Sequence, residues 1–268
     1  MKTKLFFLIH LLAFAPLVYS SDWDDPHEDI IHRATDETAY LSKLQMLDLY
    51  TPKNFGACSS SNIGRIKAIE AIKAQEPFPF DIFLRQTIQV QNVAVSPSTN
   101  CERQFGFGDT QFLVLNIYAY EWGRWGFGAT AIFPTATRPS TGQGKWQLGP
   151  AGGITILAVP DWQFHLLLQN AFTFAGPHNR PYINQLLCQP IISHHLGDGW
   201  YLRSDAEWTI TWSSNSATIP VNLGLGRVFD IFTQKVNFTA YSQWTAYHRN
   251  TSTAKWTLKV ELDMLFPD

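Results

Sequence analysis

The chain has little charge, few cysteines and no basic surplus. Charged residues make up 16% of its 268 positions and the net charge is −2, whereas an average soluble domain carries roughly 25% charged residues. A chain without a basic field has nothing to attract nucleic acid, so we expect no nucleic-acid partner. Beyond the first twenty residues, no stretch of 18 or more mainly apolar residues occurs, which argues against a helical membrane protein.

Motifs for catalysis and cofactor binding are also missing. The sequence has no Gly-x-Ser-x-Gly elbow, and its serines lie mostly in loop-like stretches. His165, His194 and His195 have no serine partner at a recognisable spacing. No phosphate loop or dinucleotide motif appears. We therefore expect no enzyme and no cofactor, and we keep an outer-membrane hydrolase only as a remote alternative.

The N-terminus predicts export. Lys2 and Lys4 precede an apolar run from Leu5 to Leu17, and a cleavage site follows near Ser20. This is the arrangement of a secretory signal peptide, and the run is too short to anchor the chain in a membrane. We assign residues 1–20 to a cleaved signal peptide.

Residues 21–40 form an acidic and polar segment, which we interpret as a solvated periplasmic tail. Metal binding by its carboxylates and imidazoles is the alternative. Weak helix propensity predicts a short helix around Glu37 to Lys43.

From about residue 81 onward the dominant pattern alternates with period two, which indicates β-strands. In the last segment, Trp256, Leu258 and Val260 share one face, and Lys259 and Glu261 share the other. Ten segments show this pattern: 81–93, 108–119, 124–134, 145–158, 162–175, 182–195, 199–212, 218–229, 235–247 and 254–266. Two weaker segments, 41–53 and 64–76, precede them, and isoleucines at period three make the second compatible with a helix.

Strand length and tryptophan placement favour a transmembrane barrel over a soluble β-sandwich. The segments are about 11–14 residues long, whereas strands of soluble proteins average 5–6 and membrane-spanning strands about 9–11. Tryptophans flank the strand ends in two groups, as in the aromatic girdles of outer-membrane barrels. One group contains Trp122, Trp125, Trp162 and Trp200, and the other Trp146, Trp212 and Trp256. We predict an all-β, antiparallel up-and-down barrel over residues 41–268, with twelve strands, or ten if the weak segments fail.

Connection lengths give the orientation. Counting back from the C-terminus, connections near 247–254, 213–218, 175–182, 134–145 and 94–107 are polar and often long. The alternate connections are shorter. Outer-membrane barrels have long outer loops and short periplasmic turns, so the C-terminus is predicted to be periplasmic.

A series of short motifs suggests a family. In order, they are Gly106-Phe107-Gly108-Asp109, Phe133-Pro134-Thr135-Ala136-Thr137, Gly144-Lys145-Trp146-Gln147-Leu148-Gly149-Pro150, Arg180-Pro181, His195-Leu196-Gly197-Asp198-Gly199-Trp200 and Gly226-Arg227-Val228-Phe229. Over residues 80–267 the chain resembles the bacterial outer-membrane barrel family named for the meta-pathway of phenol degradation. The resemblance implies a Gram-negative outer-membrane location, surrounding lipid, and porin-like transport of aromatic or hydrophobic solutes. The barrel-assembly machinery is then expected to recognise the last strand through Phe266.

The polar faces of the strands supply the candidate functional residues. We expect them to face the lumen, either as a selectivity lining or as charges that only pair with each other. The candidates are Arg85, Gln89, Gln185, Gln189, Arg203, Asp205, Glu207, Lys259, Glu261 and Asp263. The expected function is a channel or transporter for small solutes, and the alternative is a structural or adhesive barrel without transport.

Three cysteines are too few for a disulfide scaffold and fit no zinc motif. With twelve strands, Cys58 and Cys101 fall in neighbouring outer loops. Cys188 falls in mid-strand on a lipid-facing side. We therefore predict a Cys58–Cys101 disulfide and a free Cys188, with three unpaired thiols as the alternative.

Overall fold

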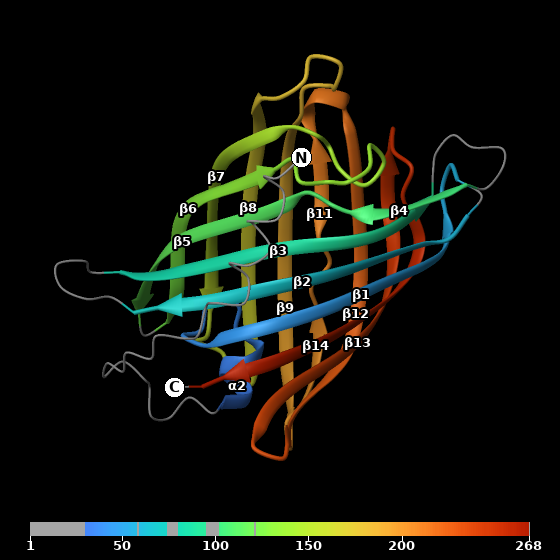
Figure 1. Ribbon diagram of the computed structural model, residues 1–268. Helices are drawn as coiled ribbons and strands as arrows, with labels where there is room; N and C mark the ends of the chain where they lie inside the picture. Colours follow the sequence, from blue (N-terminus) through green and yellow to red (C-terminus); the bar gives the residue numbers. More distant parts are fainter. Residues whose placement is uncertain (1–29, 58, 74–79, 95–101, 121, 268) are drawn as a thin grey trace.

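The chain folds as a closed antiparallel β-barrel. The structure, a computed structural model, describes residues 30–57, 59–73, 80–94, 102–120 and 122–267. Within these ranges the strand segments form one continuous wall, which closes by pairing of the first and last strands (Figure 1). Two wall strands are each interrupted once, so the described segments make twelve wall strands. The predicted all-β barrel and its count of twelve are confirmed.

The wall is built in chain order. Its first part contains β1 (Ser42–Asn54), β2 (Ser61–Ile72), β3 (Asp81–Ala94), β4 (Arg103–Phe107), β5 (Thr110–Tyr120), β6 (Gly123–Phe133) and β7 (Trp146–Ile156). Its second part contains β8 (Trp162–Ala175), β9 (Asn184–Gly197), β10 (Trp200–Ser204), β11 (Trp208–Thr211), β12 (Ser216–Ile231), β13 (Gln234–Arg249) and β14 (Ala254–Phe266). A short helix, α2 (Ile30–Thr35), precedes β1, and a 3₁₀ turn, Trp212–Ser214, follows β11. No helix among the described residues is long and apolar enough to cross a membrane.

The ambiguous second segment is a strand. Residues of β2 pair in register with β1 on one side and β3 on the other, from Ser61 to Ile72. Ile66 lies on the outer face, whereas Ile69 is buried inside. The helical alternative was wrong because two complete ladders satisfy the backbone of this segment, and its period-three isoleucines are divided between both faces.

Burial is inverted relative to a soluble protein. On β14, Leu258 is 39% exposed and faces outward, while Asp263 is 1% exposed and faces inward. Most other strands repeat this pattern of apolar side chains outside and polar side chains inside. The exception is an apolar cluster buried inside the wall, which contains Ile69, Phe83, Leu113, Leu115, Ile117 and Ala151. A sandwich requires the opposite arrangement, so that alternative is excluded. Trp122, Trp125, Trp146, Trp162, Trp200 and Trp212 are all exposed on the outside.

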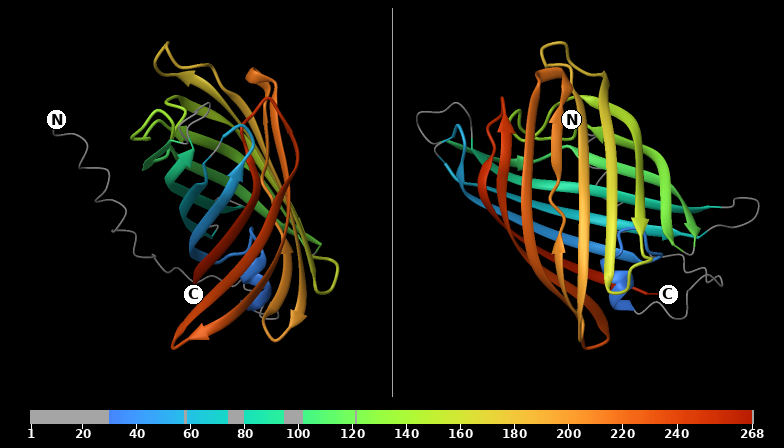
Figure 2. Two further views of the ribbon diagram at one scale, coloured as in Figure 1. Left: turned by 90° about the vertical axis from the view of Figure 1, so that its right-hand side faces the viewer. Right: turned by 180° about the vertical axis from the view of Figure 1, so that it is seen from behind.

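The two ends of the barrel differ in their connections. One end, here called the long-loop end, carries the described connections 134–145, 176–183, 212–215 and 250–253. The opposite end, the short-turn end, carries the described connections 157–161, 198–199 and 232–233, together with the end of β14 (Figure 2). The predicted loop over 94–107 was too long, because β4 continues the pairing with β3 from Ala94↔Arg103 to Val90↔Phe107.

One interruption of the wall lies between β10 and β11, where the sequence predicted a continuous strand over 199–212. At this wall break, side chains replace ladder hydrogen bonds. The backbone amide of Asp205 donates to Asn222 Oδ1 at 2.8 Å, and the Trp208 indole donates to the Pro220 carbonyl at 3.0 Å. Pro220 has no amide hydrogen to offer a neighbouring strand. Asp205 and Glu207 both line the interior, on the same face of this wall strand as Arg203.

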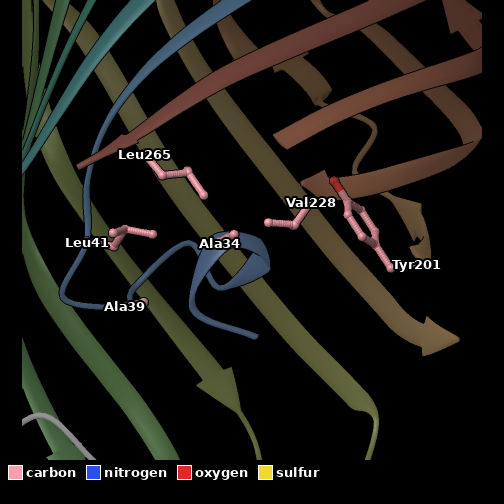
Figure 3. Close-up of a cluster of buried hydrophobic side chains, with 6 residues drawn as sticks. All are labelled: Ala34, Ala39, Leu41, Tyr201, Val228 and Leu265. Atoms are coloured by element: carbon pink, nitrogen blue, oxygen red, sulfur yellow. The ribbon is translucent and has the colours of Figure 1, made fainter. Parts of the chain in front are cut away.

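Residues 30–41, here called the lumen segment, lie inside the short-turn end. Ala34, Ala39 and Leu41 pack with Tyr201, Val228 and Leu265 of the wall (Figure 3). Asp36 is 2% exposed, so the prediction of a solvated tail is wrong for this part of it. The helix predicted around Glu37 to Lys43 is also misplaced, since α2 ends at Thr35 and Lys43 belongs to β1.

Candidate functional site

The barrel lumen holds the candidate functional site, and the lumen segment occupies its short-turn end. Thr35 donates through Oγ1 to Gln163 Oε1 at 2.7 Å, and the Thr38 hydroxyl contacts the Thr155 hydroxyl at 2.9 Å. The Gln163 amide in turn donates to the His32 carbonyl at 2.9 Å. These contacts join the segment to β7 and β8.

Two adjacent carboxylates anchor the segment by charge. Asp36 forms an ion pair with Arg124 of β6, and its Oδ1 lies 3.6 Å from His165 Nδ1. Glu37 forms an ion pair with Arg203 of β10. Arg203 also donates through Nη1 to the Thr35 carbonyl at 2.8 Å. The anchors therefore come from separate strands and hold the segment across the interior.

Glu37 remains ionised in this partly buried position. Burial alone disfavours the carboxylate form, but nearby Lys43 and Arg203 outweigh it. Together they hold the pKa of Glu37 well below its ordinary range. Lys43 Nζ lies 3.9 Å from Glu37 Oε1. The segment is thus fixed by a carboxylate that stays charged at neutral pH.

A second charged network lies at the wall break. Lys259 Nζ lies 2.5 Å from Asp205 Oδ2 and 3.3 Å from Glu261 Oε2. Asn222 donates through Nδ2 to Asp205 Oδ1 at 2.8 Å. Asp263 accepts a hydrogen bond from Asn237 Nδ2 at 3.1 Å. Buried charges need such partners, and here the Lys259 ammonium lies between two carboxylates while the Asn222 and Asn237 amides donate to the acidic groups.

An ion pair crosses the lumen between Arg65 and Glu207, with Nη1 2.8 Å from Oε2. Both residues line two cavities of about 370 and 260 Å³. The larger cavity reaches residues of the long-loop end such as Asn54 and Ser252. The smaller one, here called the β2–β3 cavity, is lined by Lys67, Arg85 and a group of glutamines. Part of the lumen can therefore hold water or a small solute.

All ten candidates from the sequence lie on the inner face of the wall. Arg85, Gln89 and Gln185 line the β2–β3 cavity. Gln189 donates to the Asp205 carbonyl at 3.3 Å. Arg203, Asp205, Glu207, Lys259, Glu261 and Asp263 belong to the charged networks described above.

Sequence reasoning missed several charged groups. Arg65 and Lys67 alternate along β2, but the ambiguous helix-or-strand pattern of that segment hid their shared face. Asp36 and Glu37 had no signal at all, because an acidic stretch before a barrel looks like a solvated tail.

The predicted disulfide lies outside the described residues, since both Cys58 and Cys101 do. Cys188 has no disulfide partner among the residues described, and it pairs in register with Leu168 and Trp208 on the outer face. Over the same part of the chain, no group of three or more His, Cys, Asp or Glu residues is arranged to hold a metal ion.

Comparison with known proteins identifies similar barrels. No family model matches the chain, and no curated protein matches it in sequence. Among solved structures, the COG4313 outer membrane channel from Pseudomonas putida F1 superposes with a TM-score of 0.65 at 10% identity, covering 92% of this chain and 100% of the channel. The NanC porin superposes with a TM-score of 0.53 at 8% identity, covering 84% and 100%. At such identities the likeness extends to the fold alone.

Proposed function

We propose that the protein is an outer-membrane channel for small solutes, closed in this conformation by its lumen segment. The observation that carries the proposal is the combination of an apolar outer wall with a charged interior that contains two cavities. A barrel of twelve strands is intermediate between small filled barrels and wide porins, so its bore suits small molecules. A purely structural barrel would have no need for unfilled polar volume.

The chemistry of the interior favours polar solutes. Charges, amides and hydroxyls dominate the lining of the β2–β3 cavity. Aromatic or hydrophobic solutes, implied by the resemblance to the phenol family, would leave these groups without hydrogen-bond partners. Polar solutes can replace the water that such groups bind.

Passage of a solute requires the lumen segment to move. Its anchors are ion pairs and hydrogen bonds, and water can satisfy the same groups if the segment leaves. Its apolar contact is one cluster, in which Ala34, Ala39 and Leu41, with Ile30 and Ile31 packed against them, meet the wall. Release is therefore far less costly than opening the wall, where each strand has two ladders.

A locked variant tests this proposal. The Thr38 and Thr155 hydroxyls are in contact, so the pair T38C/T155C can cross-link the segment to β7. In planar bilayers we expect the wild-type barrel to conduct ions, and the cross-linked variant to conduct only after reduction. The single variant T38C is the matched control, and reductant should leave its conductance unchanged.

Two results would contradict the proposal. A correctly inserted wild-type barrel without conductance or solute uptake would favour the structural alternative. Conductance that is equal in the oxidised and reduced double variant would show that the segment does not close the path.

Export and assembly belong to the same proposal. Residues 1–20 act as the cleaved signal peptide, and residues 21–40 follow as the first mature part of the chain. Phe266, exposed on the last strand, presents its ring for recognition by the assembly machinery. N-terminal sequencing of the mature protein from outer membranes, and assembly assays of F266A, test these two points.

A further inference from the structure

Two buried cations in the lumen have no hydrogen-bond or ion-pair partner among the described residues. Lys67 on β2 and Arg85 on β3 are each 7% exposed. Neither makes a hydrogen bond or ion pair with any described residue. In contrast, the lumen cations Arg65, Arg203 and Lys259 all have carboxylate partners. Burying an unpaired cation is costly, and two of them side by side repel each other.

The pairing register brings the two cations together. Ile69 lies opposite Arg85 and Lys67 lies opposite Thr87. Lys67 and Arg85 are therefore diagonal neighbours on the inner face of adjacent strands, within reach of one shared ligand group. Both line the β2–β3 cavity of about 260 Å³. One water needs roughly 10–15 Å³ by this measure, so the cavity is far larger than an inorganic anion requires.

The remaining unsatisfied groups of this cavity are also donors. Gln169 accepts a hydrogen bond from Gln111 at 2.8 Å, but its own buried Nε2 has no partner among the described residues. The buried Nε of Arg65 likewise lacks one. The two lining carboxylates are already engaged: Glu207 pairs with Arg65, and Asp109 accepts from the backbone amides of Ala136 and Gln143. The cavity therefore offers unused donors, which a ligand rich in hydrogen-bond acceptors can satisfy.

From these groups we infer that the β2–β3 cavity is a binding site for a small hydroxylated carboxylate, held on the long-loop side of the lumen segment. The inference rests on the proposed function and names its solute class. Arg85 offers a planar fork that fits a carboxylate, and Lys67 adds a second positive charge. The amides of Gln89, Gln111 and Gln169 can donate to and accept from hydroxyl groups.

The site also touches the lumen segment. Arg85 lines a smaller cavity of about 30 Å³ that Glu37 and Thr38 line from the other side. A carboxylate bound at Arg85 therefore lies next to the anchor that holds the segment. Solute binding at Arg85 and release of the lumen segment at Glu37 therefore involve residues that line the same small cavity.

Isothermal titration of the purified full-length barrel in detergent tests the site without requiring transport. The probes are gluconate, and sorbitol as its uncharged counterpart of the same carbon number. We expect saturable binding of gluconate, none of sorbitol, and at least a tenfold loss of gluconate affinity in K67Q/R85Q. The charge-conserving variant K67R/R85K should retain binding within about threefold.

The matched control removes the same two residue types away from the β2–β3 cavity. R227Q/K235Q loses the exposed Arg227 of β12 and the partly buried Lys235 of β13 near the short-turn end. Neither residue lines the cavity, so the gluconate affinity of this variant should equal that of wild type. Heat-dependent mobility in gels verifies that each variant is folded.

Several outcomes would overturn the inference. They are no binding of gluconate, equal binding of sorbitol, unchanged affinity in folded K67Q/R85Q, or equally tight binding of inorganic phosphate or of benzoate. Phosphate would indicate a simple anion site, and benzoate would show that the glutamine wall does not select hydroxyls. A barrel that conducts but fails these tests remains a channel, whereas one that binds gluconate without conducting loses the proposed function only.

Discussion

Arg65 and Glu207 meet across the barrel interior from opposite parts of the wall. Arg65 lies on β2 and Glu207 at the break between β10 and β11, and β1, β14, β13 and β12 separate the two strands. Their 2.8 Å contact divides the lumen into its two cavities. An ion pair in this position controls both the bore and the field that a permeating ion meets.

Neutralising the acidic side of this field should change ion selectivity. In D205N/E207Q, Arg65 loses its carboxylate partner and Lys259 keeps only Glu261, so the lumen becomes more positive. We expect the reversal potential in a salt gradient to shift toward anions. The opposite neutralisation, R65Q/K67Q, should shift it toward cations. If both double variants shift the potential in the same direction, these residues do not line the conducting path.

A charged side chain placed on the outer face should destabilise the barrel, and the free-energy cost should increase with its depth in the lipid bilayer. Leu223 is 57% exposed on the outside, while Thr209 lines the interior cavities. L223R should lower the free energy of unfolding by about 2–4 kcal/mol near the bilayer midplane. T209R places the same side chain in the polar interior and should cost much less. Denaturant titrations in lipid vesicles compare the two, and equal costs would contradict a lipid-facing Leu223.

The Cys58–Cys101 disulfide remains a prediction with one supporting contact. Ser59 Oγ donates to the Glu102 carbonyl at 3.3 Å, so residues directly adjoining the two cysteines touch. A bridge closing about 43 residues would stabilise the fold by roughly 3–5 kcal/mol through restriction of the unfolded chain. Non-reducing peptide mapping should recover the two cysteine peptides joined and Cys188 alkylated. Alkylation of Cys58 and Cys101 without reduction would refute the bridge.

The lumen segment should be insensitive to mild acid. Because Lys43 and Arg203 depress the pKa of Glu37 below its ordinary value near 4.5, its contribution is complete above that value. It is lost only as pH falls through the lower, folded-state pKa. In T38C, thiol labelling at residue 38 is followed by peptide mapping and expressed at each pH relative to the labelling of the denatured protein, because the reactive thiolate fraction itself falls in acid. We expect this relative labelling to stay slow from pH 7 to 5 and to rise in stronger acid.

The variant T38C/E37Q isolates this carboxylate. Its labelling should be faster at pH 7 and depend less on acid, because the ionised group is absent. Identical profiles for the two proteins would mean that Glu37 does not anchor the segment.

The sequence predicted the strands of the barrel wall far better than the lumen segment that lies inside the barrel. Period-two alternation assigned inner and outer faces correctly, because a barrel strand presents its two sides to opposite environments. Residues such as Lys259 and Leu258 could therefore be placed from spacing alone. The alternation failed in β2, where Ile66 and Ile72 lie outside and Ile69 inside, and in β5, where Leu113, Leu115 and Ile117 are buried inside.

The lumen segment could not be predicted, for a physical reason. Its anchors are far away in the chain: Asp36 bonds to Arg124, 88 positions on, and Glu37 to Arg203, 166 positions on. No local pattern records such contacts. The position of Lys67 beside Arg85 likewise depends on strand register, and the periodicity of the sequence does not give the register.

The barrel wall should open locally at the wall break more often than elsewhere. Near Asp205 and Pro220, the side chains of Asn222 and Trp208 supply the hydrogen bonds that strands supply elsewhere. Such bonds open by a side-chain rotation, whereas a ladder bond opens only when strands separate. Amide protons at residues 205–207 should therefore exchange with solvent deuterium well before those of β12 and β13, which pair along most of their length. The barrel then has one seam in mid-wall that fluctuates while the rest of the cylinder stays closed.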